Sequence, residues 1–182
     1  MILSPSKRPQ SGTTMVETMV AVALVAAFFA TIFELNAVCL RYIDASKESV
    51  AALQGVQDRL EALRNLAFTG SPNPSGSDLA NATYLQTLMT TPADGSDFAA
   101  TKPTEVVTIK AYNTATKSTS GSGIQITRPA GANVTPSIDL NSLVFANPPA
   151  VVLVNVKYQW SMLGGRPGIE QTETIIASGT KK

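Results

Sequence analysis

The sequence contains no histidine and only one cysteine among its 182 residues. Histidine is the commonest general base and the commonest metal ligand in proteins, so its absence excludes Ser-His-Asp and Cys-His catalytic arrangements. Cys39 has no second cysteine with which to form a disulfide in the chain. The segment Gly121-Ser122-Gly123 lacks the lysine and following helix that a phosphate-binding loop needs. We therefore expect no enzyme activity and no bound cofactor.

Charged residues are also few, at 15% of the chain, and the two signs nearly balance, with 14 basic and 13 acidic side chains. Nucleic-acid binding requires a dense basic surface, so nucleic acid is not an expected partner. The acids Asp94, Asp97 and Asp139 are isolated in predicted loops, and the spacing Asp94-Gly95-Ser96-Asp97 is only weak evidence for a calcium site. We expect solvated loop residues there and no metal site.

Proline is absent from Thr13 to about Ala67, and Gly55 is the only glycine in that stretch. Alanine, leucine, valine and glutamate dominate it, which favours a helix. A helix of about 55 residues would be about 80 Å long at 1.5 Å per residue. Unbroken helices of this length are typical of coiled coils, membrane spans and filament cores.

The two halves of this predicted helix differ in polarity. Residues 18–33 are apolar on every side, and the run through Leu40 covers about 23 residues, enough to span a bilayer. Glu34 interrupts the run near the far interface, where its carboxylate could reach water. From Arg41 the pattern becomes amphipathic, which predicts packing on a sheet, contact with another helix in an assembly, or both. The predicted apolar stripe is Val50, Leu53, Val56, Leu60, Leu63 and Ala67, and the polar residues placed largely off it are Lys47, Glu48, Gln54, Asp58, Arg59, Glu61 and Arg64.

The rest of the chain predicts a small antiparallel sheet. Gly70, Pro72 and Pro74 end the helix, and residues 78–90 are expected to form a short helix. The predicted strands are 105–112, 123–128, 142–145, 151–162 and 169–177, the last two forming a hairpin around the turn 164–168, with loops at 91–103 and 114–122. Trp160 is expected to anchor the core. The fold class is therefore α+β, with a long N-terminal helix whose second half packs on an antiparallel sheet of about four strands.

Glu17 lies where the apolar run begins, after the short polar segment Ser11–Thr14. A charged group inside a membrane helix is costly without a partner, so Glu17 is a candidate functional residue. Lys7 and Arg8 precede it and predict the cytoplasmic flank under the positive-inside rule. The alternative is that Glu17 stays hydrated among lipid headgroups.

The segment Gly12-Thr13-Thr14-Met15-Val16-Glu17, with its apolar continuation, resembles the N-terminus of type IV prepilins and type II secretion pseudopilins. In that family a membrane peptidase cleaves after the glycine and methylates the new amine, and the fifth mature residue is glutamate. The resemblance implies cleavage between Gly12 and Thr13, methylation of Thr13, and filament assembly through Glu17, paired with the N-terminal amine of a neighbouring subunit. This chain has Thr13 where the family usually has phenylalanine or methionine, and Glu34 where many members have a proline.

The resemblance also implies an organisation and a location. The implied segments are a leader at 1–12, a transmembrane or filament-core helix at 13–40, its amphipathic continuation at 41–68 and a periplasmic β-rich domain at 69–182. The chain would be a structural subunit of a type IV pilus or type II secretion pseudopilus. Its Ser/Thr/Gly-rich domain with few lysines favours a minor subunit over the main one. The subunit would be anchored in the bacterial inner membrane or present in a filament at the cell surface. Its partners would be other pilin or pseudopilin subunits, bound through the N-terminal helix, and the prepilin peptidase.

Two other functions remain open. A non-polymeric, signal-anchored periplasmic binding domain would need neither Glu17 nor cleavage after Gly12. An exported enzyme with a conventional signal peptide would be cleaved near residue 30, and the sequence offers it no catalytic arrangement.

Overall fold

The computed structural model describes residues 14–71, 73–93, 103–131, 134–139, 150–162 and 165–179. The chain divides into two compact units, Met1–Ile43 and Asp44–Lys182. A single helix, α1 (Met15–Arg64), contributes residues to both units. It begins two residues later and ends three residues earlier than the sequence predicts. At its end the amide of Leu66 donates to the carbonyl of Leu63 at 3.1 Å, a tighter turn that closes the helix.

The second unit contains a five-stranded antiparallel sheet. Its strands are β1 (Thr104–Asn113), β2 (Ser118–Arg128), β3 (Ser137–Asp139), β4 (Val151–Ser161) and β5 (Pro167–Ala177). Their order across the sheet is β3-β2-β1-β4-β5, so β1 is central and pairs with both β2 and β4. Along β4, Val152, Val154, Val156 and Tyr158 are buried and alternate with partly exposed residues, as the sequence predicts.

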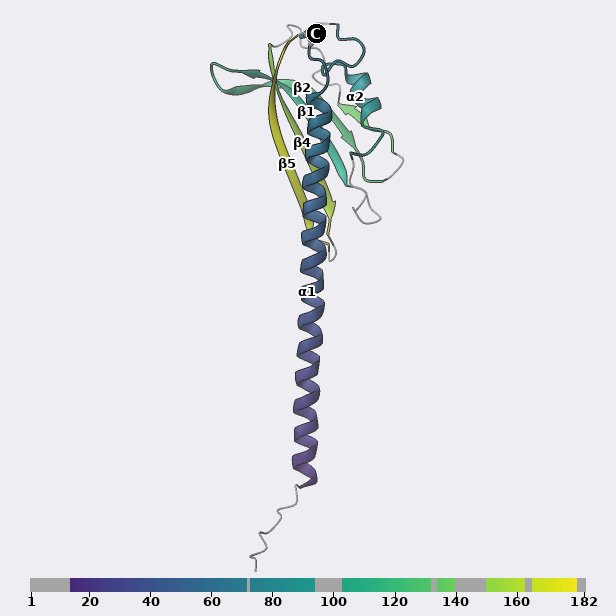
Figure 1. Cartoon of the computed structure of the whole chain (residues 1–182), viewed down its shortest axis with the longest axis vertical. Helices are drawn as coiled ribbons and strands as arrows, with labels where there is room; N and C mark the ends of the chain where they lie inside the picture. Colours follow the sequence, from purple (N-terminus) through teal and green to yellow (C-terminus); the bar gives the residue numbers. More distant parts are fainter. Residues whose placement is uncertain are drawn as a thin grey trace, which may run out of the picture. The chain divides into compact units, whose positions relative to one another are not determined.

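Within this unit, the C-terminal part of α1 lies against one face of the sheet (Figure 1). The core between them contains Val56, Leu60 and Leu63 from the helix together with the buried residues of β1, β2 and β4. The short helix α2 (Ala82–Leu88) adds Leu85 and contacts β2 and β3. Asn81 caps α2 by accepting a hydrogen bond from the amide of Tyr84 at 3.2 Å. The predicted α+β fold is thus confirmed.

Several element boundaries differ from the sequence predictions. The predicted loop at 114–122 is largely wrong, because β2 begins at Ser118 and only residues 114–117 form the turn after β1. Glycine is depleted in strands and threonine is enriched in them, so the composition of this segment does not decide its conformation. Pairing with β1 satisfies its backbone groups and does decide it. The antiparallel pair of β4 and β5 is confirmed, with β4 ending at Ser161 and β5 beginning at Pro167, two residues earlier than predicted. Asp139 lies in β3, whereas Asp94, Asp97 and the predicted strand 142–145 lie outside the described residues.

Gly55 marks a close approach of α1 to β4. A Cβ atom added there would lie 2.8 Å from Cε2 of Tyr158, and the Tyr158 hydroxyl donates to the Gly55 carbonyl at 3.3 Å. Alanine normally gains about 1 kcal/mol over glycine within a helix. Here we expect the clash to outweigh that gain, so that Gly55→Ala lowers the free energy of unfolding by about 1–3 kcal/mol.

Urea unfolding of the whole chain in detergent micelles, followed by the fluorescence of Trp160, measures this change. Gln57→Ala, at an exposed position of the same helix, is the control and should change stability by less than about 0.5 kcal/mol. A Gly55→Ala protein more stable than the wild type would show that the contact has room for a methyl group.

Candidate functional site

The first candidate site is the beginning of α1. Thr14 is the last residue before the helix, and its hydroxyl oxygen accepts a hydrogen bond from the amide of Glu17 at 3.3 Å. The carbonyl of Thr14 accepts from the amide of Thr18 at 3.2 Å. Threonine followed three residues later by glutamate is the capping-box pattern. A negative charge in the first turn also interacts favourably with the positive end of the helix dipole. Glu17 therefore has a local role at the helix start in addition to the role that the resemblance implies.

The structure places Glu17 at this start with its side chain exposed. The other two predicted site residues, Gly12 and Thr13, lie outside the described residues. The structure therefore describes the surroundings of the predicted cleavage site only from Thr14 onward.

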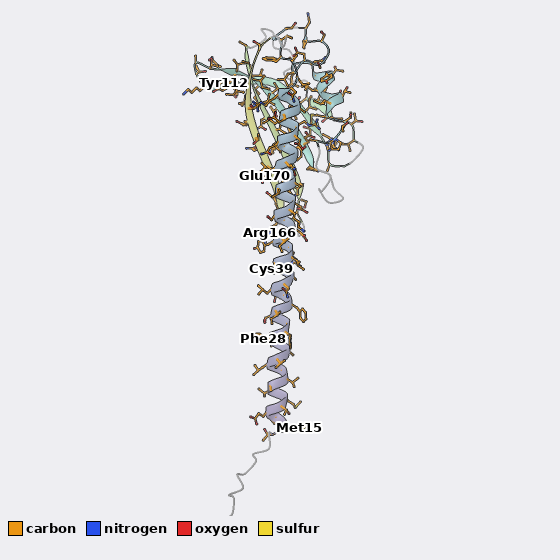
Figure 2. The ribbon with its side chains drawn as sticks, viewed as in Figure 1. Met15, Phe28, Cys39, Tyr112, Arg166 and Glu170 are labelled. Carbon is orange, nitrogen blue, oxygen red and sulfur yellow. The ribbon has the colours of Figure 1, made fainter. Side chains whose placement is uncertain are left out.

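The helix that follows Glu17 is long and apolar enough to cross a membrane. Every described residue of the first unit is exposed, and Figure 2 shows Met15, Phe28 and Cys39 along this helix. A continuous apolar surface of this extent marks an interaction with lipid or protein. The exposed large apolar side chains include Val20, Leu24, Val25, Phe29, Ile32, Phe33, Leu35 and Leu40.

Three polar or reactive side chains lie within or beside this apolar surface. Glu34 and Arg41 are exposed, and neither takes part in an ion pair or hydrogen bond with the described part of the chain. Cys39 is a free thiol and its side chain is exposed. It lies within the predicted apolar run, which extends through Leu40.

A second notable site lies in the core of the other unit, where four polar side chains meet. Arg128 of β2, Glu105 of β1 and Tyr158 of β4 are register partners and lie side by side across the sheet. Arg59 of α1 covers this row, with Nε 2.5 Å from Oε1 and Nη2 3.3 Å from Oε2 of Glu105. Only 4% of Arg59 and 1% each of Glu105 and Arg128 are exposed.

The guanidinium groups of Arg59 and Arg128 in this buried polar cluster also donate to backbone carbonyls. Arg59 donates to the carbonyl of Leu88 at 3.3 Å and to that of Thr91 at 2.6 Å, which joins α1 to the segment after α2. Arg128 donates through Nη2 to the carbonyl of Gly131 at 2.5 Å, while its buried Nε has no partner among the residues that the structure describes. The cluster thus fixes α1, β1, β2 and the end of α2 in one arrangement.

The electrostatics of the cluster follow from its burial. Desolvation raises the pKa of the Glu105 carboxyl above its usual value, and the guanidinium of Arg59 and the charge of Arg128 oppose that rise. Burial also raises the pKa of the Tyr158 hydroxyl, and the nearby Glu105 carboxylate adds to the effect. Two guanidinium groups face one carboxylate, so loss of that carboxylate would leave both positive charges without a counter-ion.

The sequence interpretation missed this cluster, although a signal for it exists. Glu105 lies on the same strand face as Val107 and Ile109. Arg128 lies on the same strand face as Ile124 and Ile126. The alternation therefore places the side chains of Glu105 and Arg128 on the buried face of the sheet. The placement of Arg59 off the apolar stripe was wrong, because its charge is compensated by Glu105. The predicted stripe itself is shifted: Val50 and Leu53 are 63% and 42% exposed, and the buried helix face is Ala52, Gly55, Val56, Arg59, Leu60 and Leu63.

Trp160 is partly buried and packs against the core, in agreement with its predicted role. Its indole Nε1 donates to Oε2 of Glu48 at 3.2 Å, which links β4 to α1. On the same side, the hydroxyl of Ser49 donates to Oε1 of Glu170 at 2.7 Å. These contacts hold the β4–β5 hairpin against the helix.

Two open hollows occur on the described surface of the second unit. One, of about 480 Å³, lies beside the β1–β2 turn near Tyr112 and includes Asn113 and Thr119. The other, of about 400 Å³, follows α1 between Ser46 and Gln54. Neither brings together titratable groups, and the described residues contain no set of three or more Cys, Asp or Glu side chains placed to hold a metal ion.

The local features that bear on function are therefore the capped start of α1 with Glu17, the exposed apolar helix and the buried polar cluster. Comparison of the chain with protein-family models, with curated proteins and with solved structures found no match.

Proposed function

We propose that the chain is a structural subunit of a filament of the type IV pilus or type II secretion pseudopilus class, and not an enzyme. The observation that carries this proposal is the first turn of α1, where Glu17 opens an apolar, exposed helix long enough to cross a membrane. An acid at this position is costly in hydrocarbon unless a cationic partner neutralises it. The amine of an adjacent subunit, exposed by cleavage after Gly12, has the charge and the depth to do so.

In this proposal the helix serves successively as membrane anchor and filament core. Before assembly, lipid of the bacterial inner membrane surrounds the apolar residues, and the second unit lies in the periplasm. During assembly, the helices of other pilin or pseudopilin subunits replace the lipid. The prepilin peptidase is the second partner, because it creates the Thr13 amine and methylates it. Within the second unit, the buried polar cluster holds the C-terminal part of α1 to β1 of the sheet, as a stable periplasmic domain requires.

Leader removal provides a direct test. We expect the membrane-bound wild-type protein to begin at Thr13 and to be found in sheared filaments when it is expressed with its native assembly machinery. Gly12→Leu, like the milder Gly12→Ala, should block cleavage, because the peptidase of the family that this chain resembles requires glycine before the cut.

Mass spectrometry of the intact membrane protein measures this outcome, and Ser11→Ala, which keeps Gly12, should be processed normally. Finding Thr13 as the N-terminus of the Gly12→Leu protein would contradict the assigned cleavage site. A wild-type protein that begins at another residue, and that is absent from filaments, would instead favour the non-polymeric anchored binding domain. The hollow near Tyr112 would then be the first place to look for a ligand.

A further inference from the structure

Glu34 is an acid within the apolar part of α1 that has no charged partner on its own helix turn. A helix side chain pairs with residues three or four positions away. Those positions around Glu34 are Ala30, Thr31, Ala37 and Val38, none of which carries a positive charge. Glu34 makes no hydrogen bond or ion pair with the described residues. Its carboxylate is therefore available for a cation from outside the chain.

The nearest cation toward the C-terminus is Arg41, seven residues from Glu34. Seven residues make about two helical turns, so the two side chains lie on one side of α1 but about 10 Å apart along its axis. This separation prevents an i,i+3 or i,i+4 pair within one chain. Asp44, three residues after Arg41, forms no ion pair with it in the part of the chain that the structure describes. One helix side thus presents an acid and a base that form no ion pair with any residue that the structure describes.

The side of the helix that carries these charges contains four alanines, and Val20 and Val38 lie at its border. Small residues allow two helix backbones to approach closely in a membrane. Phe28, Phe29 and Ile32 lie on the other sides of the helix, by the 100° turn per residue. We define the Glu34 face as Ala23, Ala27, Ala30, Glu34, Ala37 and Arg41.

We propose that the Glu34 face contacts a second copy of this chain, with Glu34 of one copy paired to Arg41 of the next. The inference rests on the proposed function and adds the partner and the register of the contact. Charge complementarity supports a second copy as the occupant, because the acid and the base that need each other occur on the same face of the same sequence. Parallel copies that are staggered along the axis bring them together.

The stagger that pairs Glu17 with a neighbour also pairs Glu34. A copy whose Thr13 is level with Glu17 of the first chain is shifted by four residues, about 6 Å. At this shift its Glu34 is level with Val38 of the first chain, three residues before Arg41. Helix side chains incline toward the N-terminus, and an arginine side chain is long enough to cover that remaining turn. One axial shift of four residues therefore gives both Glu17 and Glu34 a cationic partner on the neighbouring copy.

The symmetry of this contact determines what it builds. Each copy offers Glu34 to one neighbour and Arg41 to the other, which is a heterologous contact that adds subunits along an axis without closing. Identical copies must then be adjacent, as in a filament built mainly of this chain. This arrangement departs from the expectation of a minor subunit.

Charge reversal tests the pairing. In cells with the native assembly machinery, Glu34→Arg and Arg41→Glu should each lower the amount of the chain in sheared filaments by about tenfold or more, because like charges would then meet. The double variant Glu34→Arg with Arg41→Glu should recover most of the wild-type level. Wild-type incorporation of either single variant, or no recovery in the double variant, would overturn the pairing.

Cross-linking in isolated membranes tests the helix contact without filaments. With Cys39→Ser as background, one tagged copy carries Ala27→Cys and a second carries Thr31→Cys, which are level at a four-residue shift. The matched control places cysteines at Phe28 and Ile32, with the same spacing on another side of α1. We expect several-fold more disulfide-linked dimer from the first pair; equal or greater yield from the control would overturn the contact.

The two measurements separate this inference from the function on which it rests. Wild-type protein in filaments, together with normal incorporation of Glu34→Arg, would retain the proposed function and reject the pairing. Absence of the wild type from filaments would reject the function, and the Ala27–Thr31 cross-link would then decide whether copies meet at this face.

Discussion

Glu17→Gln is expected to leave the chain folded and inserted in the membrane but to remove it from filaments. The substitution keeps the hydrogen bond to the Thr14 hydroxyl, because the donor is the backbone amide of residue 17. Glutamine cannot supply the negative charge that a neighbouring amine requires. Removing one partner of a buried charge pair costs about 3–5 kcal/mol, which corresponds to a loss of incorporation of about 100-fold or more. Glu17→Ala should lose assembly to at least the same degree.

Thr14→Ala is the matched control, because it removes the cap and keeps the charge. Loss of a threonine cap costs about 0.5–2 kcal/mol at the helix start, which an apolar helix held in a membrane can tolerate. We therefore expect Thr14→Ala to enter filaments at close to the wild-type level. Blots of sheared filaments, normalised to the membrane fraction, measure both variants. If Thr14→Ala were lost from filaments and Glu17→Gln retained, assembly would depend on the Thr14 cap, and the charge of Glu17 would have no role in it.

Glu105→Gln is expected to cause the largest loss of stability in the second unit. The substitution keeps the size of the side chain but removes the one carboxylate that faces both Arg59 and Arg128. Two buried guanidinium groups would remain without a counter-ion, and the free energy of unfolding should fall by about 3–5 kcal/mol. Because the whole of a domain's stability is about 5–15 kcal/mol, part of the protein is expected to unfold at moderate temperature.

The exposed pair Glu61–Arg64 provides a control of the same chemistry on the surface. Its atoms are 3.0 Å apart, but both side chains are more than half exposed. Glu61→Gln should therefore change stability by less than about 1 kcal/mol. Urea unfolding of the full chain in micelles, read through the fluorescence of Trp160, compares the two variants. Equal stability of Glu105→Gln and Glu61→Gln would show that water or other groups compensate the buried arginines.

These two predictions concern the two ends of the same helix. Glu17 is placed by a local signal, since its capping partner Thr14 is three residues away. Arg59 is placed by contacts with residues 29, 32 and 46 positions away. The described first part of α1 is exposed throughout, while the last part is held by the sheet of its own chain. The filament function that we propose would use both properties in one helix.

The sequence by itself determined the features that depend on neighbouring residues. The helix, its apolar first half and the strand alternation of β4 all follow from local sequence patterns, because backbone geometry sets which side chains share a face. For the same reason, the position of Glu17 at the start of the apolar run was enough to identify it as a candidate. The α+β class followed from the order of these patterns.

The tertiary structure decided the features that depend on residues far apart in the chain. The assignment of Ser118 to β2 came from pairing with β1, because the serines and glycines after it form no apolar alternation that would indicate a strand. The burial of Arg59 came from Glu105, 46 residues later, because a charge enters a core only where a counter-charge meets it. The tight fit of Gly55 against Tyr158 likewise has no local signal, since packing distances are set only when helix and sheet meet.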